Sequence, residues 1–282
     1  MDKAYFYAQT AHAIPQPMIA NFIKYPVPDL PSIPTTHCET PFEARRAGAE
    51  AARALRSMWG IGWGPISNLI RLIESKGIRV FYVRESVEQL DGFACWTGGK
   101  PYMFLNQKLE DPARESLNAA HELGHLVMHR DIALDAHTDF YESMAFGFAA
   151  EFLAPWETFK KEAPVIPDLN HLGRLKTRWR ISMQAMVKHM HSNGAISDAA
   201  YQNAFRRFNV LGYRRGPEPG WLVPDHSVIH TKFVEMVEKK GLSLPNVAED
   251  AGMSDRLLGV PASSATFGKD SPFFSTISTN LV

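Results

Sequence analysis

The sequence predicts an α+β protein in which a small sheet comes before a series of helices. Three observations lead to this class. Short segments rich in β-branched and aromatic residues lie close together at 78–83, 93–96 and 102–105. Longer segments with apolar residues spaced three and four apart lie on both sides of them. One of these helical segments carries two histidines four residues apart, at 121 and 125.

Length and composition are consistent with a globular protein that has a sizeable core. The chain has 282 residues, of which 45% are hydrophobic. Its 30 Lys and Arg balance its 30 Asp and Glu, so no global charge attracts a polyanionic partner. No apolar run approaches the roughly 20 residues that cross a bilayer, and the first residues lack the pattern of a secretory signal. We therefore expect a cytoplasmic protein with no membrane association.

The chain has only two cysteines, Cys38 and Cys95. Two cysteines cannot build a disulfide framework or a zinc cluster of thiolates. Any metal site must therefore use histidine and carboxylate side chains.

The N-terminal part is predicted to be an extended arm followed by two helices. Residues 1–44 contain seven prolines, which remove hydrogen-bond donors and disfavour long helices. From 42 to 59 the chain is rich in Ala and Arg and favours a helix. A shorter helix is expected from 68 to 76, and Gly77 is suited to end it.

The three strand-like segments follow directly. The second and third are separated by Gly98, Gly99 and Lys100, a pattern typical of a hairpin turn. We therefore expect a small antiparallel or mixed sheet.

The rest of the chain is expected to be helical. Asp111 and Pro112 predict the start of a helix that runs to about 129, and further helices are expected at 141–152, 171–191 and 197–208. Residues 171–215 contain nine basic residues and one acidic residue, whereas residues 216–282 contain five basic and eight acidic residues. We therefore expect three parts: an arm at 1–44, a main domain at 45–215, and a small helical region with a tail at 216–282.

The histidine pair predicts a metal site. Residues four apart on a helix differ by about 40° in rotation, so the imidazoles of His121 and His125 leave the same face and can bind one cation. Zinc suits them because it accepts neutral imidazole nitrogens at about 2.0–2.1 Å. Glu122 lies beside the first histidine, where its carboxylate can take a proton from a metal-bound water that attacks a carbonyl group.

A catalytic zinc site needs a third protein ligand and one open position. The best candidate is Glu142, which lies 17 residues after His125 near the start of the next predicted helix. Apolar residues follow it at three- and four-residue spacing, so its face is expected to pack toward the histidine helix.

Four other residues compete for this role: His129, His137, Asp139 and Glu151. His129 is one further turn along the histidine helix, about 6 Å from His125 along the axis, and is better suited to a supporting or capping position. Glu151 is expected to face solvent.

Two stretches of the chain resemble the motifs of the ImmA/IrrE family of metallopeptidases. The first is NAAHELGHLVMH at 118–129, and the second is ESMAFGFAAEFLAP at 142–155. The family patterns are H-E-x-G-H-x-x-x-H and E-x-x-A-N-x-F-A-A-x-L-L-x-P. The resemblance covers about residues 45–215, and it implies that His121, His125 and Glu142 bind zinc and that Glu122 is the general base.

The resemblance also implies a fold and a biological role. The fold would be a zincin-like core of a small sheet, the metal helix and a second helix that donates the glutamate. The activity would be zinc-dependent endopeptidase cleavage of a helix-turn-helix repressor or antitoxin-like regulator, in a DNA-damage response or in mobile-element control. The chain departs from the pattern at Phe146, where the family has Asn. It also has only the proline-rich start where many relatives have an upstream helix-turn-helix.

An alternative is a regulator that is not a peptidase and binds DNA or a repressor. Its contacts would come from the basic helices of 171–215 and from residues 244–254, whose small residues have the spacing of a helix-turn-helix. Basic residues on amphipathic helices usually form their solvent-exposed side, so a protein substrate is favoured over nucleic acid.

Overall fold

The computed structural model of the chain describes residues 25–34, 38–83, 92–106, 111–130, 132, 139–214, 216–225 and 227–243. Three predicted features therefore lie outside the described residues. They are most of the N-terminal arm, the helix-turn-helix-like unit at 244–254, and the tail.

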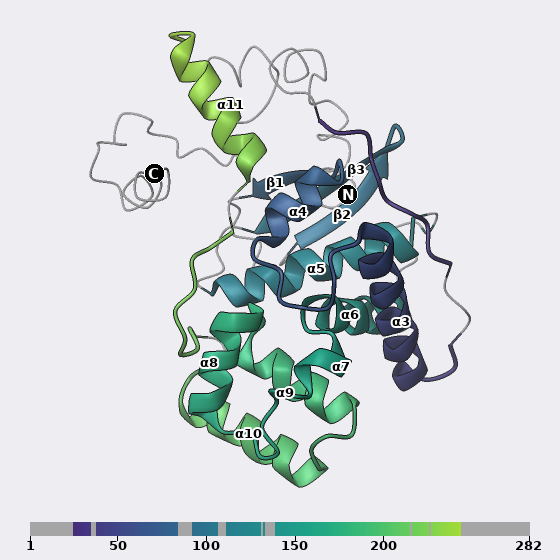
Figure 1. Cartoon of the computed structure of the whole chain (residues 1–282), viewed down its shortest axis with the longest axis vertical. Helices are drawn as coiled ribbons and strands as arrows, with labels where there is room; N and C mark the ends of the chain where they lie inside the picture. The colour runs from purple at the N-terminus through teal and green to yellow at the C-terminus, as the bar shows by residue number, and fades with distance from the viewer. Residues whose placement is uncertain are drawn as a thin grey trace.

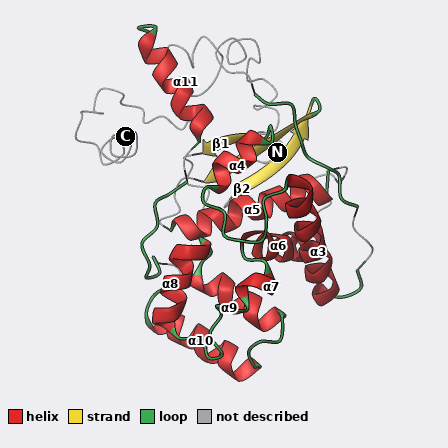
Figure 2. Ribbon diagram, in the orientation of Figure 1, coloured by secondary structure: helices red, strands yellow, loops and turns green. Residues whose placement is uncertain are grey.

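The structure confirms the α+β, zincin-like class, with a three-stranded sheet and a helical C-terminal half (Figures 1 and 2). The helices are α3 (Pro41–Trp59), α4 (Leu69–Ser75), α5 (Pro112–Met128), α6 (Asp139–Leu153), α7 (Trp156–Phe159), α8 (Leu169–Trp179), α9 (Met183–Ser192), α10 (Asp198–Val210) and α11 (Val228–Lys239). The strands are β1 (Arg79–Val83), β2 (Gly92–Thr97) and β3 (Lys100–Asn106). Among the described helices, none is both long enough and apolar enough to cross a bilayer.

Local signals set most of the element boundaries. The Thr40 hydroxyl accepts a hydrogen bond from the Glu43 amide at 3.2 Å and caps the start of α3. α3 ends where Gly60 adopts a φ of 64°, a left-handed conformation that glycine takes readily. The Asp111 carboxylate caps α5 by accepting from the Ala113 amide at 3.0 Å, and proline occupies the first helical position, as the sequence predicted.

The sheet is mixed, with strand order β1-β3-β2. β2 and β3 form the predicted antiparallel hairpin, and β1 pairs with β3 in parallel. A parallel pair needs a crossover between its strands. Here β2 lies between β1 and β3 in sequence and is placed at the sheet edge. In Figure 1, α5 lies along the sheet and separates it from α6 and from the layer of α8, α9 and α10.

Helices α3 and α6 pack at very short distance, and two glycines make this possible. A Cβ at Gly147 would lie 2.1 Å from the Arg45 carbonyl oxygen, and a Cβ at Gly48 would lie 1.9 Å from the Met144 carbonyl oxygen. Neither position can hold a side chain unless the backbone moves. The close contact fixes α6, which carries Glu142, against the rest of the core.

The single helix predicted at 171–191 is wrong: the structure has two helices, α8 and α9. Arg180 adopts a φ of 55° between them, and the Ser182 hydroxyl caps α9 by accepting from the Ala185 amide. The break is stabilised by a distant segment, because the Arg180 guanidinium donates to Asp225 and to the Val223 carbonyl, each at 2.6 Å.

The segment 216–229 is held against the preceding helices by buried charged groups. Lys176 on α8 is 2% exposed and pairs with Asp111 at 2.6 Å, and its ammonium also donates to the Glu218 carbonyl at 3.1 Å. The Glu74 carboxylate accepts from the Val228 amide at 3.0 Å, at the start of α11. The domain boundary between residues 215 and 216 stays a prediction. The contacts just described connect residues on either side of it.

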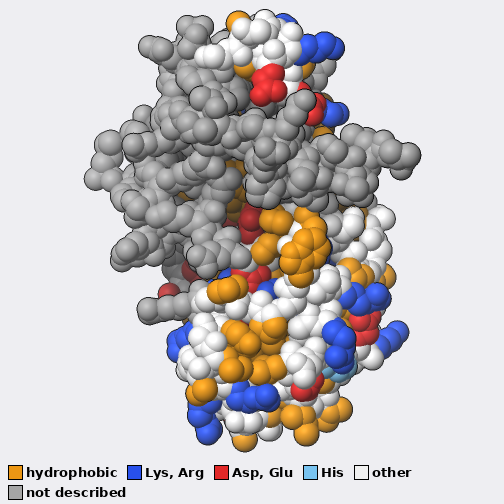
Figure 3. Space-filling model, turned by 90° about the vertical axis from the view of Figure 1, so that its left-hand side faces the viewer, with side chains coloured by type: hydrophobic (Ala, Val, Ile, Leu, Met, Phe, Trp, Pro, Cys, Tyr) orange, Lys and Arg blue, Asp and Glu red, His pale blue; other side chains and the backbone are white. Residues whose placement is uncertain are grey.

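The basic residues of 171–215 lie in different environments. Lys176 and Arg180 are engaged in ion pairs with Asp111 and Asp225. On the face shown in Figure 3, Lys and Arg side chains are scattered around hydrophobic ones in the lower half. This face therefore lacks one continuous basic surface among its described residues.

Candidate metal centre

The two histidines of the motif lie side by side on α5. Both are buried, with His121 8% and His125 7% exposed. Their Nε2 atoms are 3.1 Å apart. As the helical spacing predicted, both imidazoles therefore direct a ring nitrogen to the same point.

Glu142 completes the group from the first turn of α6. One carboxylate oxygen lies 3.2 Å from the Nε2 of His121, and the other lies 3.4 Å from the Nε2 of His125. Hydrogen bonds from His121 and then from His125 hold the pKa of Glu142 well below its usual range, despite partial burial. The side chain is 46% exposed, so this face of the group is open to solvent.

These three side chains fit a zinc ion. Ligand atoms at about 2.0–2.1 Å from a tetrahedral ion lie about 3.3 Å from one another. The three separations in the structure, 3.1, 3.2 and 3.4 Å, are close to that value. His121, His125 and Glu142 can together hold a metal ion.

Two aromatic side chains and a third histidine surround the ligand group. The Nδ1 atoms of His125 and His129 are 2.9 Å apart, so one ring donates a hydrogen bond to the other. The Tyr141 ring lies 4.8 Å from that of His129, measured between centroids. His129 therefore lies where a group that orients a metal-binding imidazole is expected.

The Phe146 ring packs against the His121 ring. Its ring centroid is 4.3 Å from that of His121, and the Phe146 side chain is 46% exposed. An apolar ring thus occupies the position at which the family pattern has an amide. The Nδ1 of His121 is buried without a hydrogen-bond partner among the described residues.

Glu122 lies between α5 and the sheet. It is 8% exposed, and its Cγ is 3.5 Å from the position that a Cβ would take at Gly92, the first residue of β2. The start of the edge strand therefore borders the carboxylate that was predicted to be the general base. The sequence did not indicate this neighbour, because the pairing of distant segments sets it.

The other candidate ligands are not part of the group. Asp139 is exposed at the start of α6, and His137 lies outside the described residues. The expectation that Glu151 faces solvent is wrong: its side chain is 3% exposed and pairs with Arg53 at 3.1 Å. Glu151 lies nine residues after Glu142 on the same helix, about 13 Å away along the axis, and cannot reach the histidines.

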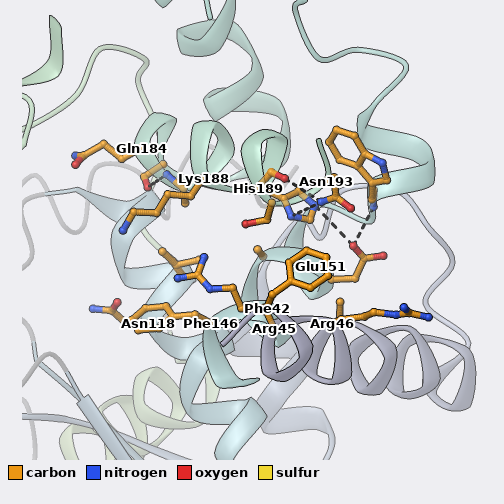
Figure 4. A pocket seen from close by; sticks show the side chains of 18 of the residues that line it. Phe42, Arg45, Arg46, Asn118, Phe146, Glu151, Gln184, Lys188, His189 and Asn193 are labelled. Atoms are coloured by element: carbon orange, nitrogen blue, oxygen red, sulfur yellow. Dashed lines mark hydrogen bonds and ion pairs between the residues drawn. The ribbon is translucent and has the colours of Figure 1, made fainter. Parts of the chain in front are cut away.

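A cavity of about 1010 Å³ opens beside the candidate centre, between α3, α6 and α9 (Figure 4). Phe146 lines it, as do Leu117 and Asn118 from the turn of α5 before His121. No pattern in the sequence predicted this cavity. Its only sequence signal was the group of arginines in the helix at 42–59, which does not reveal what the helix packs against.

Comparisons with known proteins found one matching family model and a similar solved structure. Residues 73–191 match the model of a peptidase family described as the IrrE N-terminal-like domain. Among solved structures, a Mycobacterium tuberculosis transcriptional regulator is similar, with 19% identity and a TM-score of 0.39 over 54% of this chain. The match spans 52% of that regulator, about half of its length. No curated protein sequence matches significantly. The matched residues 73–191 are less than half of the chain, and they include His121, His125 and Glu142.

Proposed function

We propose that the protein is a zinc-dependent endopeptidase. The observation that carries this proposal is the convergence of His121, His125 and Glu142, with one side open, inside a peptidase-family domain. Two neutral donors and one carboxylate are a donor set that zinc accepts in hydrolytic enzymes.

Each side chain has a distinct role in the proposed reaction. His121, His125 and Glu142 would hold the ion, which would supply a Lewis acid able to polarise a carbonyl group and lower the pKa of water. Glu122 takes a proton from the attacking water and delivers it to the leaving amine. The buried position of Glu122 suits this role, because little bulk solvent competes for its carboxylate.

The proposed substrate is a helix-turn-helix repressor or an antitoxin-like regulator in the cytoplasm. Support comes from the resemblance of the two motifs, at 118–129 and 142–155, to the ImmA/IrrE family.

The test is Glu122→Gln in the full chain, together with zinc analysis. A candidate repressor, encoded by the neighbouring gene, is co-expressed with the wild-type protein or with Glu122→Gln. Its cleavage is followed by mass spectrometry. We expect the variant to keep one equivalent of zinc and to lose cleavage by at least about a thousandfold. Glu238→Gln, at an exposed carboxylate of α11 away from the candidate centre, is the matched control and should cleave normally.

Two outcomes would contradict the proposal. If neither the wild-type protein nor Glu122→Gln binds zinc, the group of His121, His125 and Glu142 is not a zinc site. If Glu122→Gln still relieves repression in cells, the protein acts by binding, as in the alternative of a regulator that is not a peptidase.

A further inference from the structure

The cavity between α3, α6 and α9 lies next to the candidate centre, with the Phe146 side chain between them. Phe146 contacts the His121 ring on one side and lines the cavity on the other. From Glu142 to Ala150, which also lines the cavity, α6 rises about 12 Å. An extended peptide covers that length in about four residues. A substrate held at the metal ligands can therefore reach into the cavity.

The cavity walls carry an excess of positive charge. Six basic side chains line it, against two carboxylates, Glu151 and Glu157. Both carboxylates are already paired, Glu151 with Arg53 at 3.1 Å and Glu157 with Lys160. The six basic residues are Arg45, Arg46, Arg53, Arg114, Lys188 and Arg214.

Three of these cations have no carboxylate within ion-pair distance in the described part of the chain: Arg45, Lys188 and Arg214. In Figure 4, Lys188 from α9 and Arg45 from α3 extend into the same space from opposite walls. Partial burial, and then the charges of Arg45 and Arg214, lower the pKa of Lys188. Cations that repel one another in a concave site favour the binding of an anion.

We propose that this cavity binds an acidic segment of the protein substrate, with an Asp or Glu about two to four residues from the cleaved bond meeting Arg45, Lys188 and Arg214. The inference rests on the proposed peptidase function and adds the class of sequence that the enzyme selects. It assigns Arg45 and Lys188 as specificity-determining residues.

The walls favour a peptide over a nucleic acid. Beside the cations, the cavity is lined by the rings of Phe42, Phe146 and Trp156, with Leu117 and Ala150. Phe42 and Phe146 are 64% and 46% exposed, so their apolar surfaces are available to side chains next to the acidic residue. A concave site that combines apolar walls with charged groups is typical of sites that bind small molecules or peptide side chains.

The first experiment measures which bonds are cut. Zinc-loaded protein is incubated with a peptide library derived from a whole proteome, and the new termini are identified by mass spectrometry. We expect Asp and Glu to be enriched two to four residues from the cleaved bond, on one side. Arg45→Gln with Lys188→Gln should lower kcat/KM for these peptides about 30-fold and leave neutral peptides nearly unchanged. Arg206→Gln with Arg207→Gln, at exposed positions of α10, is the matched control and should have no effect.

The second experiment measures binding without cleavage. A fluorescent peptide with four consecutive glutamates is titrated into Glu122→Gln protein, with the cavity double variant and the α10 double variant as comparisons. We expect the cavity variant alone to weaken binding about 30-fold. Lys188→Glu, which replaces a cation by an anion, should also weaken binding of this peptide.

The outcomes separate the two proposals. Cleavage without acidic enrichment, or acidic enrichment unchanged in the cavity variant, overturns the inference while the peptidase function stands. Absence of all cleavage, with binding of the acidic peptide that depends on Arg45 and Lys188, overturns the peptidase function and leaves an acidic-peptide site. A mixed-sequence oligonucleotide that binds more tightly than the acidic peptide and depends on the same two residues overturns the choice of ligand.

Discussion

The two ends of α6 carry carboxylates in opposite situations. Glu142 in the first turn is 46% exposed and lies against two imidazoles, which lower its pKa. Glu151 in the last turn is 3% exposed and is paired with Arg53, and burial raises its pKa. The exposed carboxylate belongs to the candidate centre, and the buried one joins α6 to α3. Exposure and function are therefore linked on this helix, because a hydrolytic site must leave room for water and substrate.

The largest expected effect is on metal binding. Glu142→Gln keeps the shape of the side chain but removes the charge of the third ligand. We expect zinc affinity to fall about a thousandfold, about 4 kcal/mol, in a competition titration with a fluorescent chelator. Equal affinity in the variant and the wild-type protein would show that another residue is the third ligand.

The buried end of α6 should make the fold sensitive to acid. His189 on α9 lies 3.7 Å from Glu151 and donates to the Ala154 carbonyl at 2.9 Å. Burial lowers the pKa of His189 to about 4 from 6.5. The unfolded chain therefore binds a proton between these values and the folded protein does not. The stability contributed by His189 is complete above pH 6.5 and is lost as pH falls to 4, by about 3 kcal/mol.

Chemical denaturation of zinc-free protein between pH 7 and pH 4 measures this effect. His189→Gln should flatten the dependence of the free energy of unfolding on pH. Because buried carboxyl groups also titrate in this range, the difference between the two proteins is the quantity to compare. If the free energy of unfolding depends on pH equally in the two proteins, His189 takes up its proton over the same pH range in the folded and unfolded states.

A third prediction concerns the middle of α6, between Glu142 and Glu151. Gly147→Ala places a methyl group against the Arg45 carbonyl oxygen, so the free energy of unfolding should fall by about 2 kcal/mol. Gly173→Ala, on α8, is the matched control because its nearest contact is 3.9 Å away. The control should be neutral or stabilising, by up to about 1 kcal/mol. Equal effects would mean that α3 and α6 can separate freely.

The smallest effect is expected for Glu151→Gln. The side-chain oxygen of the new glutamine can still accept a hydrogen bond from the Trp156 backbone amide. The variant avoids the cost of burying a charge but loses the ion pair with Arg53. We expect these terms to offset each other within about 1 kcal/mol, with unchanged zinc affinity in the same chelator titration. A loss of zinc in this variant would contradict the contrast between the two ends of α6.

Local patterns in the sequence were enough to predict much of the fold and the members of the candidate ligand group. The Ala- and Arg-rich stretch predicted α3, and Asp111 and Pro112 predicted the start of α5. The spacing of His121 and His125 predicted that their ring nitrogens converge. Glu142 followed from the helical period after it. These features depend on neighbours within a few residues, which the sequence displays directly.

The expectations that were wrong depended on distant contacts. The break at Arg180 is stabilised by Asp225, and the burial of Glu151 depends on Arg53 and on the packing of α9. The same limit applies to the cavity, whose walls come from helices more than a hundred residues apart in sequence. No local pattern encodes such pairings, because the period of a helix shows which face is apolar but not what covers it.

The contacts of segment 216–229 have a consequence for biosynthesis. The buried ammonium of Lys176 on α8 donates a hydrogen bond to the Glu218 carbonyl. The Glu74 carboxylate on α4 accepts one from the Val228 amide at the start of α11. A nascent chain released only as far as residue 215 would leave these charges partly uncompensated in a low-dielectric interior. We therefore expect the part of the chain that contains α4, α5 and α8 to reach its final form late in translation, once about 230 residues have left the ribosome. A messenger truncated before that point should yield a product that proteases remove.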